Sequence, residues 1–172
     1  MVTGYKLTNK ADRTRGQLQW GADVTHRAVG PGKAFCSPDL IHFYSSALVA
    51  RLHDPIHGNY GPEAHLWEIE AAEPVYDDLG LKMGAKTVTT LRQVDLPVVT
   101  VLCRVHYGIL CAKEVYHDAE WLRWADGWLS GKNRDNAATY AAPVYATTAA
   151  YAAHAAYGTY ASYAAAYVTY GT

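Results

Sequence analysis

The segment from Val98 to Gly131 constrains the fold most strongly, because it holds the longest helical periodicity and three of the five tryptophans. Apolar residues at steps of three and four place one stripe on one face of a helix. Asp118 suits an N-cap, and Gly131 suits a helix stop. The stripe comprises Val101, Leu102, Val105, Ile109, Ala112 and Val115, then Trp121, Leu122, Trp124, Ala125, Trp128 and Leu129. The segment therefore predicts a helical hairpin.

The tryptophan stripe of this hairpin suits either a ligand platform or a packed core. Tryptophan is usually highly buried in proteins, and its indole N–H then needs only one acceptor. We therefore expect the stripe to pack the hairpin and not to bind a ligand.

The first hundred residues alternate between short strand patterns and one helical pattern. Strands are predicted at 3–7, 17–20, 65–71 and 87–91, where apolar and polar residues alternate. A helix is predicted from Ser37 through Leu52, with Ser37 as N-cap and Pro38 at its first position. Residues 79–86 are expected to form a bend. The irregular order favours an α+β fold with a small mixed sheet of about four strands.

Charge divides the chain into a globular domain at 1–136 and a tail at 137–172. All 31 charged side chains precede Ala137, and the net charge is −1 with a pI near 6.7. A balanced charge gives no basic field for nucleic acid. The three cysteines suit reduced thiols, and no secretion signal follows Met1. We expect a cytoplasmic protein that does not bind nucleic acid.

The tail is a low-complexity sequence of alanine and tyrosine without a single charge. Alanine favours helix, although the three-residue tyrosine period also fits another rod with three residues per turn. A membrane span is the weaker alternative, because alanine and tyrosine are less lipophilic than leucine. We expect the rings to drive homo-oligomerisation. The residues proposed for self-association are Tyr151, Tyr157, Tyr160, Tyr163, Tyr167 and Tyr170.

Several segments together resemble a family of phage and bacterial proteins. They include Thr14-Arg15-Gly16 with Gln19-Trp20-Gly21, Asp54-Pro55-Ile56-His57, Leu66-Trp67-Glu68, Gly108-Ile109-Leu110-Cys111-Ala112 and Trp128-Leu129-Ser130-Gly131. The resemblance covers roughly residues 3 to 136, and an alanine-rich tail follows in that family too. It implies an accessory protein of a mobile element, acting in the host cytoplasm, and it implies no chemistry.

Histidines gather in the first half of the chain, where five of the eight lie between His26 and His65. His53 and His57 have the i, i+4 spacing of a zinc-ligand pair, but Pro55 lies between them and no zincin glutamate is present. We therefore expect no metal. The candidates for a small-molecule or host-protein ligand are Trp20, His26, His42, His57 and Trp67.

An arginine, a serine and a glutamate occur in the chain order found in ADP-ribosyltransferases. By that resemblance Arg15 holds the phosphates of NAD, Ser37 orders the ribose site, and Glu70 stabilises an oxocarbenium-like transition state. The alternative interpretation places Glu70 on a solvated strand face with Glu68. Two hypotheses follow: a non-enzymatic binding protein that captures a ligand or nucleotide in counter-defence and assembles through its tail, or an NAD-dependent ADP-ribosyltransferase-like enzyme.

Overall fold

The computed structural model describes residues 1–78, 80, 82–114, 116–132 and 134. The chain divides into two compact units, Met1–Val98 and Val99–Thr172. The predicted boundary after residue 136 lies outside the described residues, as do all the tail tyrosines proposed for self-association. Among the residues that are described, every helix is too short or too polar to span a bilayer.

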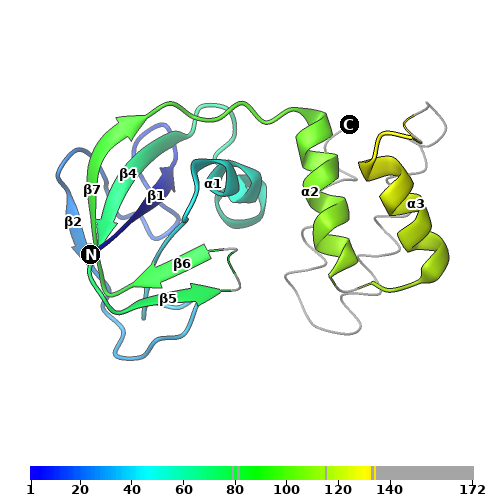
Figure 1. Ribbon diagram of the computed structural model, residues 1–172. Coiled ribbons are helices and arrows are strands. Elements are labelled where there is room, and N and C mark those ends of the chain that lie inside the picture. Colours follow the sequence, from blue (N-terminus) through cyan, green and yellow to red (C-terminus); the bar gives the residue numbers. More distant parts are fainter. Residues whose placement is uncertain (79, 81, 115, 133, 135–172) are drawn as a thin grey trace. The chain divides into compact units, whose positions relative to one another are not determined.

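The first unit is built on an antiparallel sheet of four strands (Figure 1). In spatial order these are β1 (Val2–Thr8), β4 (His65–Ala71), β7 (Thr87–Val94) and β2 (Thr25–Arg27). Alternation of apolar and polar residues predicted three of them, namely β1, β4 and β7. The predicted strand at 17–20 is wrong. Those residues form a loop with one bridge between Arg13 and Gln19, and Trp20 is buried in the core.

A second, three-stranded antiparallel sheet was not expected from the sequence. It contains β3 (Ile41–Phe43), β6 (Lys82–Ala85) and β5 (Val75–Asp78) in that order. A bridge between Tyr5 and Tyr44 joins the two sheets. The bend predicted over residues 79–86 is therefore wrong for residues 82–85, which form strand β6. All strand pairs of both sheets are antiparallel, so neither sheet is the mixed one expected.

The helix of the first unit is shorter than predicted. Helix α1 spans Ala47–His53, and its N-cap is Ser46, whose side chain accepts a hydrogen bond from the Leu48 amide. Ser37 instead closes a turn, with its Oγ donating to the carbonyl of Ala34. The predicted helix from Ser37 is wrong because the backbone of 41–43 pairs with β6. A π-helical turn, η1 (Asp54–Gly58), follows α1.

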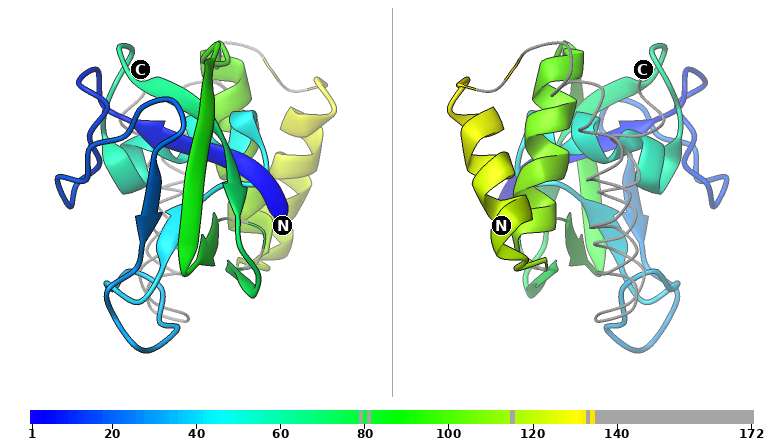
Figure 2. Two further views of the ribbon diagram at one scale, coloured as in Figure 1. Left: turned by 90° about the vertical axis from the view of Figure 1, so that its left-hand side faces the viewer. Right: turned by 90° about the vertical axis from the view of Figure 1, so that its right-hand side faces the viewer.

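Apolar side chains lie on both faces of the four-stranded sheet. Figure 2 shows the ribbon of this sheet from two further sides. One core lies between the two sheets and contains Trp20, Ile41, Phe43, Trp67, Ile69, Ala71, Ala85 and Val88. A second core joins this sheet to α1 and contains Leu7, Tyr44, Ala50, Ala64 and Leu66. Strand β4 supplies Trp67 and Ile69 to the first core and Leu66 to the second, as its alternation requires.

The second unit contains the predicted helical hairpin, α2 (Val101–Lys113) and α3 (Ala119–Leu129). Asp118 is the N-cap of α3, where its carboxylate accepts the amides of Glu120 and Trp121. Gly131 has a φ of 81°, a conformation that glycine adopts readily after a helix. The shared core is Ile109, Ala112, Trp121, Ala125 and Trp128. The hairpin prediction is confirmed, and with the sheets it makes the fold α+β.

Candidate functional site

Six titratable side chains that are distant in the sequence come together in the first unit. We call them the Lys–His cluster: Lys6, His42, Tyr44, His53, His57 and Lys82. They come from β1, β3 and the residue after it, α1, η1 and β6. Perturbed titratable groups gather at functional sites more often than elsewhere, so the cluster is the candidate site of this unit.

His42 lies between the two lysines. Its Nε2 accepts a hydrogen bond from the amide of Cys36 at 3.2 Å, so this nitrogen carries no proton and the ring is neutral. Burial, together with the ammonium groups of Lys6 and Lys82, lowers the pKa of His42 to about 4. The ring of Phe35 stacks on His42, with centroids 5.6 Å apart. His42 is thus a neutral imidazole in a cationic setting.

Lys6 projects from β1 with its Nζ 2.5 Å from the carbonyl oxygen of His42. The ammonium also lies 5.2 Å from the centroid of the Trp20 ring. Burial lowers the pKa of Lys6 to about 8, so it stays mainly protonated at neutral pH. No carboxylate in the described part of the chain contacts this ammonium. Within the described ranges, this positive charge is stabilised by a carbonyl oxygen and an aromatic face.

Tyr44, His53 and His57 form the other half of the cluster. The Tyr44 hydroxyl lies 2.9 Å from Nδ1 of His57, and the rings of His53 and His57 are 5.0 Å apart. Burial lowers the pKa of His53 to about 4 and that of His57 to about 3, with further repulsion from Lys82. Burial also raises the pKa of Tyr44 above its ordinary value. Tyr44 therefore keeps its proton, and its hydroxyl shares a hydrogen bond with Nδ1 of a neutral His57, whose tautomer sets the donor.

Asp54 holds these two histidines in place. Its carboxylate is 1% exposed and accepts the amides of Tyr60 at 2.8 Å and Gly61 at 2.9 Å. Arg51 donates to the same carboxylate at 3.0 Å and to the carbonyl of Gly61. This network closes the loop that carries η1. The i, i+4 spacing of His53 and His57 thus brings both rings into one cluster, as it would on a helix.

The sequence predicted a ligand site at five residues, of which the structure places two in the cluster. His42 and His57 belong to it. Trp20 and Trp67 are 2% and 6% exposed and lie in the core between the sheets. His26 packs its ring edge against Trp20, with Nε2 2.7 Å from the carbonyl of Gln19. Their contacts are those of packing residues.

Arg15, Ser37 and Glu70 lie in separate parts of the first unit. Arg15 is in a loop where its amide donates to the Tyr60 hydroxyl, and Glu70 pairs with residues of β1 and β7. No hydrogen bond or ion pair among the described residues joins any two of the three. The ADP-ribosyltransferase alternative stays a prediction, which nicotinamide release from NAD and its loss in Glu70→Gln would test.

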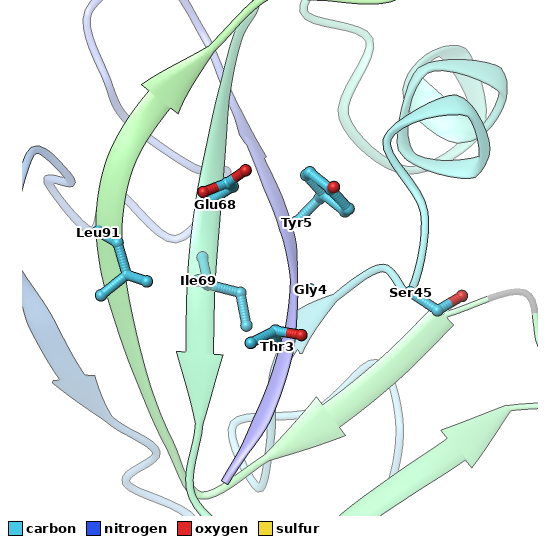
Figure 3. Close-up of a pocket in the computed structure, with 7 residues that line it drawn as sticks. All are labelled: Thr3, Gly4, Tyr5, Ser45, Glu68, Ile69 and Leu91. Carbon is cyan, nitrogen blue, oxygen red and sulfur yellow. The ribbon is translucent and has the colours of Figure 1, made fainter.

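A pocket of about 310 Å³ opens on the face of the larger sheet that carries Glu68 (Figure 3). Its lining residues are Thr3, Gly4, Tyr5, Ser45, Glu68, Ile69 and Leu91. The strand register shifts here, so that Leu91 and Arg92 both lie opposite Glu68. Arg92 makes two hydrogen bonds to the Glu68 carboxylate, at 2.7 and 2.9 Å. Because this ion pair neutralises the single carboxylate of the pocket, the Lys–His cluster is the stronger candidate.

Nothing in the sequence pointed to three members of the cluster, namely Lys6, Tyr44 and Lys82. Lys6 and Lys82 join because β1 and β6 both lie next to β3, a pairing between distant segments. Tyr44 joins because residues 41–44 are extended and not helical. Among the residues described, no group of three or more His, Cys, Asp or Glu side chains is placed to share a metal ion.

Comparison with protein-family models, curated proteins and solved structures finds no match to this chain.

Proposed function

We propose that the first unit is a binding protein for a small anionic molecule, which it captures at the Lys–His cluster. The observation that carries the proposal is the ammonium of Lys6, which no carboxylate among the described residues contacts. Lys82 adds a second buried cation beside the same histidines, 3.8 Å from the carboxylate of Asp78. A concentration of positive charge in a partly desolvated place costs free energy that an anionic ligand would recover.

The donors of the cluster suit a phosphate group. Ammonium groups form charge-assisted hydrogen bonds to phosphate oxygens, and neutral imidazole N–H groups can add to them. Burial lowers the pKa values of the three histidines most, and the charge of Lys82, joined at His42 by that of Lys6, lowers them further. A bound anion would offset that repulsion, so binding is expected to draw protons onto the histidines. Proton uptake by the histidines on binding is therefore a measurable signature of anion capture at the cluster.

The same pKa values favour binding over acid–base catalysis. A general acid or base works best when its pKa lies near the working pH. His57, with a pKa of about 3, is a weak base at neutral pH, and Tyr44 is a weak acid because burial raises its pKa. The pair is suited to hold a hydrogen-bonded arrangement rather than to transfer protons. This supports the non-enzymatic hypothesis.

Calorimetric titration of the full chain with pyrophosphate and with ADP, at matched ionic strength, tests the proposal. We expect binding whose heat varies with the ionisation enthalpy of the buffer between pH 5 and 6, because the histidines take up protons. Lys82→Met should weaken binding by roughly tenfold or more, since a charge-assisted hydrogen bond contributes about 1.5 to 3 kcal/mol.

Lys10→Met is the matched control for this titration. It removes the same charge from an exposed lysine that pairs with Glu63 at 3.1 Å. The control should bind as the unmodified chain does. Absence of binding by both probes, or equal weakening in the two variants, would refute anion capture at the cluster.

Self-association through the tail is the second part of the proposal. Its support is the sequence of residues 137–172, which carries eight tyrosines and no charge. Sedimentation of the full chain and of a chain ending at residue 136 measures it. We expect only the full chain to form an assembly. The same oligomeric state for the full and the shortened chain would contradict self-association through the tail.

A further inference from the structure

Cys36 and Lys82 form a close pair at the edge of the Lys–His cluster. The thiol of Cys36 is exposed, and its Sγ lies 2.9 Å from Nζ of Lys82. The lysine side chain itself is only 3% exposed. The ring of Phe35 lies 5.6 Å from the same ammonium. A reactive sulfur that solvent can reach is thus in contact with a buried amine.

Both members of the pair are held by the fold. The backbone of Cys36 has a φ of 58°, and its amide donates to Nε2 of His42. Lys82 belongs to β6, where it pairs with Asp78 of β5 and lies 3.8 Å from that carboxylate. A thiol and an amine fixed at this distance can react with each other after one of them is activated.

An ammonium at hydrogen-bond distance stabilises the thiolate, which is the form of cysteine that attacks peroxides. The product is a sulfenic acid, which can condense with a nearby nitrogen to give a sulfenamide. We propose that Cys36 and Lys82 are a peroxide-responsive pair that forms a covalent bond between Sγ and Nζ. Hydrogen peroxide is the oxidant.

The reaction balances in two steps. The Cys36 thiolate attacks one peroxide oxygen, so an S–O bond forms, the O–O bond breaks, and hydroxide leaves and becomes water. The neutral amine of Lys82 then attacks the sulfenic sulfur, so the S–N bond forms and a second water leaves with the sulfenic oxygen. Cysteine is oxidised, peroxide is reduced, and the protein loses two hydrogen atoms.

The bond would also change the cluster. Lys82 loses its positive charge on linking, which removes one of the cations beside His42, His53 and His57. Weaker anion capture by the oxidised protein rests on the proposed function, whereas the covalent bond does not. Experiments can therefore refute the formation of the bond and its effect on anion binding separately.

Peptide mapping by mass spectrometry after treatment of the full chain with hydrogen peroxide tests the bond. We expect a peptide that joins Cys36 to Lys82 and is lighter than its two parts by two hydrogen atoms. Dithiothreitol should restore the original mass, because thiols reduce sulfenamides. Oxidation of Cys36 to sulfinic acid without any joined peptide would overturn the proposal.

Cys103 is an internal control in the same sample. It is also exposed, and its Sγ accepts a hydrogen bond from the Thr100 hydroxyl instead of a lysine. It should oxidise without joining a lysine. Cys36→Ser should abolish the joined peptide, and so should Lys82→Arg, which keeps the charge but lacks the amine. Persistence of the joined mass in either variant would contradict the assignment.

Discussion

The two units of this protein bury different kinds of side chain. In the first unit, His53, Asp54 and Lys82 are all 3% exposed or less. In the described part of the second unit, the buried side chains are apolar or aromatic, namely Ile109, Ala112, Trp121, Ala125 and Trp128. The hairpin is therefore held mainly by packing, whereas the sheet unit also depends on buried charge.

This difference shows where a ligand site is to be sought. Burial of apolar surface lowers the free energy of the hairpin, although the indole N–H groups of Trp121 and Trp128 are buried there without a hydrogen-bond partner among the described residues. A desolvated cation raises the free energy of a fold unless something neutralises the charge, so Lys6, which no carboxylate among the described residues contacts, points to a role outside stability. The pocket beside Glu68 gives no such indication, because Arg92 already neutralises its carboxylate.

Removal of an aromatic ring from the hairpin core should give the largest loss of stability. Trp121 is 2% exposed and contacts the rings of Tyr116 and Trp124. Trp121→Ala is expected to lower the free energy of unfolding of the second unit by roughly 4 to 5 kcal/mol, through lost burial and a cavity. Chemical denaturation followed by circular dichroism measures it. A loss below about 1 kcal/mol would show that packing does not dominate the hairpin.

Removal of a buried carboxylate tests the dependence of the first unit on charge. Asp54→Ala leaves the guanidinium of Arg51 and the amides of Tyr60 and Gly61 without their acceptor. We expect a loss of roughly 3 to 4 kcal/mol, because breaking a buried pair leaves an uncompensated charge.

Glu63→Ala is the control for Asp54→Ala. It removes an exposed ion pair with Lys10 and should cost less than about 1 kcal/mol. Chemical denaturation curves of the two variants measure both losses of unfolding free energy. Similar losses in both would mean that Asp54 does not organise the loop.

Acid should lower the free energy of unfolding of the first unit by about 2 to 3 kcal/mol, because its buried histidines take up protons when the unit unfolds. Burial, followed by repulsion from Lys82, lowers the pKa of His53 from 6.5 to about 4. Between these two values the unfolded chain binds more protons than the folded one, so stability is complete above pH 6.5 and falls toward pH 4. His53→Phe keeps a ring but cannot titrate, so its stability should fall less steeply with acid. An equally steep fall of stability with acid in the unmodified chain and in His53→Phe would show that His53 does not cause the effect.

Sequence periodicity predicted the elements whose pattern is local. The hairpin follows from three- and four-residue steps, and Asp118 caps α3 as expected. Strands β1, β4 and β7 follow from alternation. The helix predicted from Ser37 failed because residues 41–43 bond to β6, more than forty positions away in the chain, and such pairing overrides a helical pattern.

The candidate site was predictable only in part for the same reason. His42 and His57 stood out as histidines, and the four-residue step from His53 to His57 brought two rings together. Lys6 looked like an ordinary strand lysine and Lys82 like a lysine in a bend, since nothing local distinguishes a buried lysine from a solvated one. Their importance depends on which strands lie beside β3.

The sequence by itself determined the helical hairpin, its cap and stop, the alternating strands and the confinement of all charge to the first 135 residues. These features depend on side-chain spacing and backbone preference within a few residues. Only the tertiary structure decided that Lys82 lies near three neutral histidines, that Lys6 reaches the carbonyl of His42 and that Cys36 contacts Lys82. Those contacts arise when strands distant in the sequence pair, and the cost of burying charge exists only once that pairing excludes water.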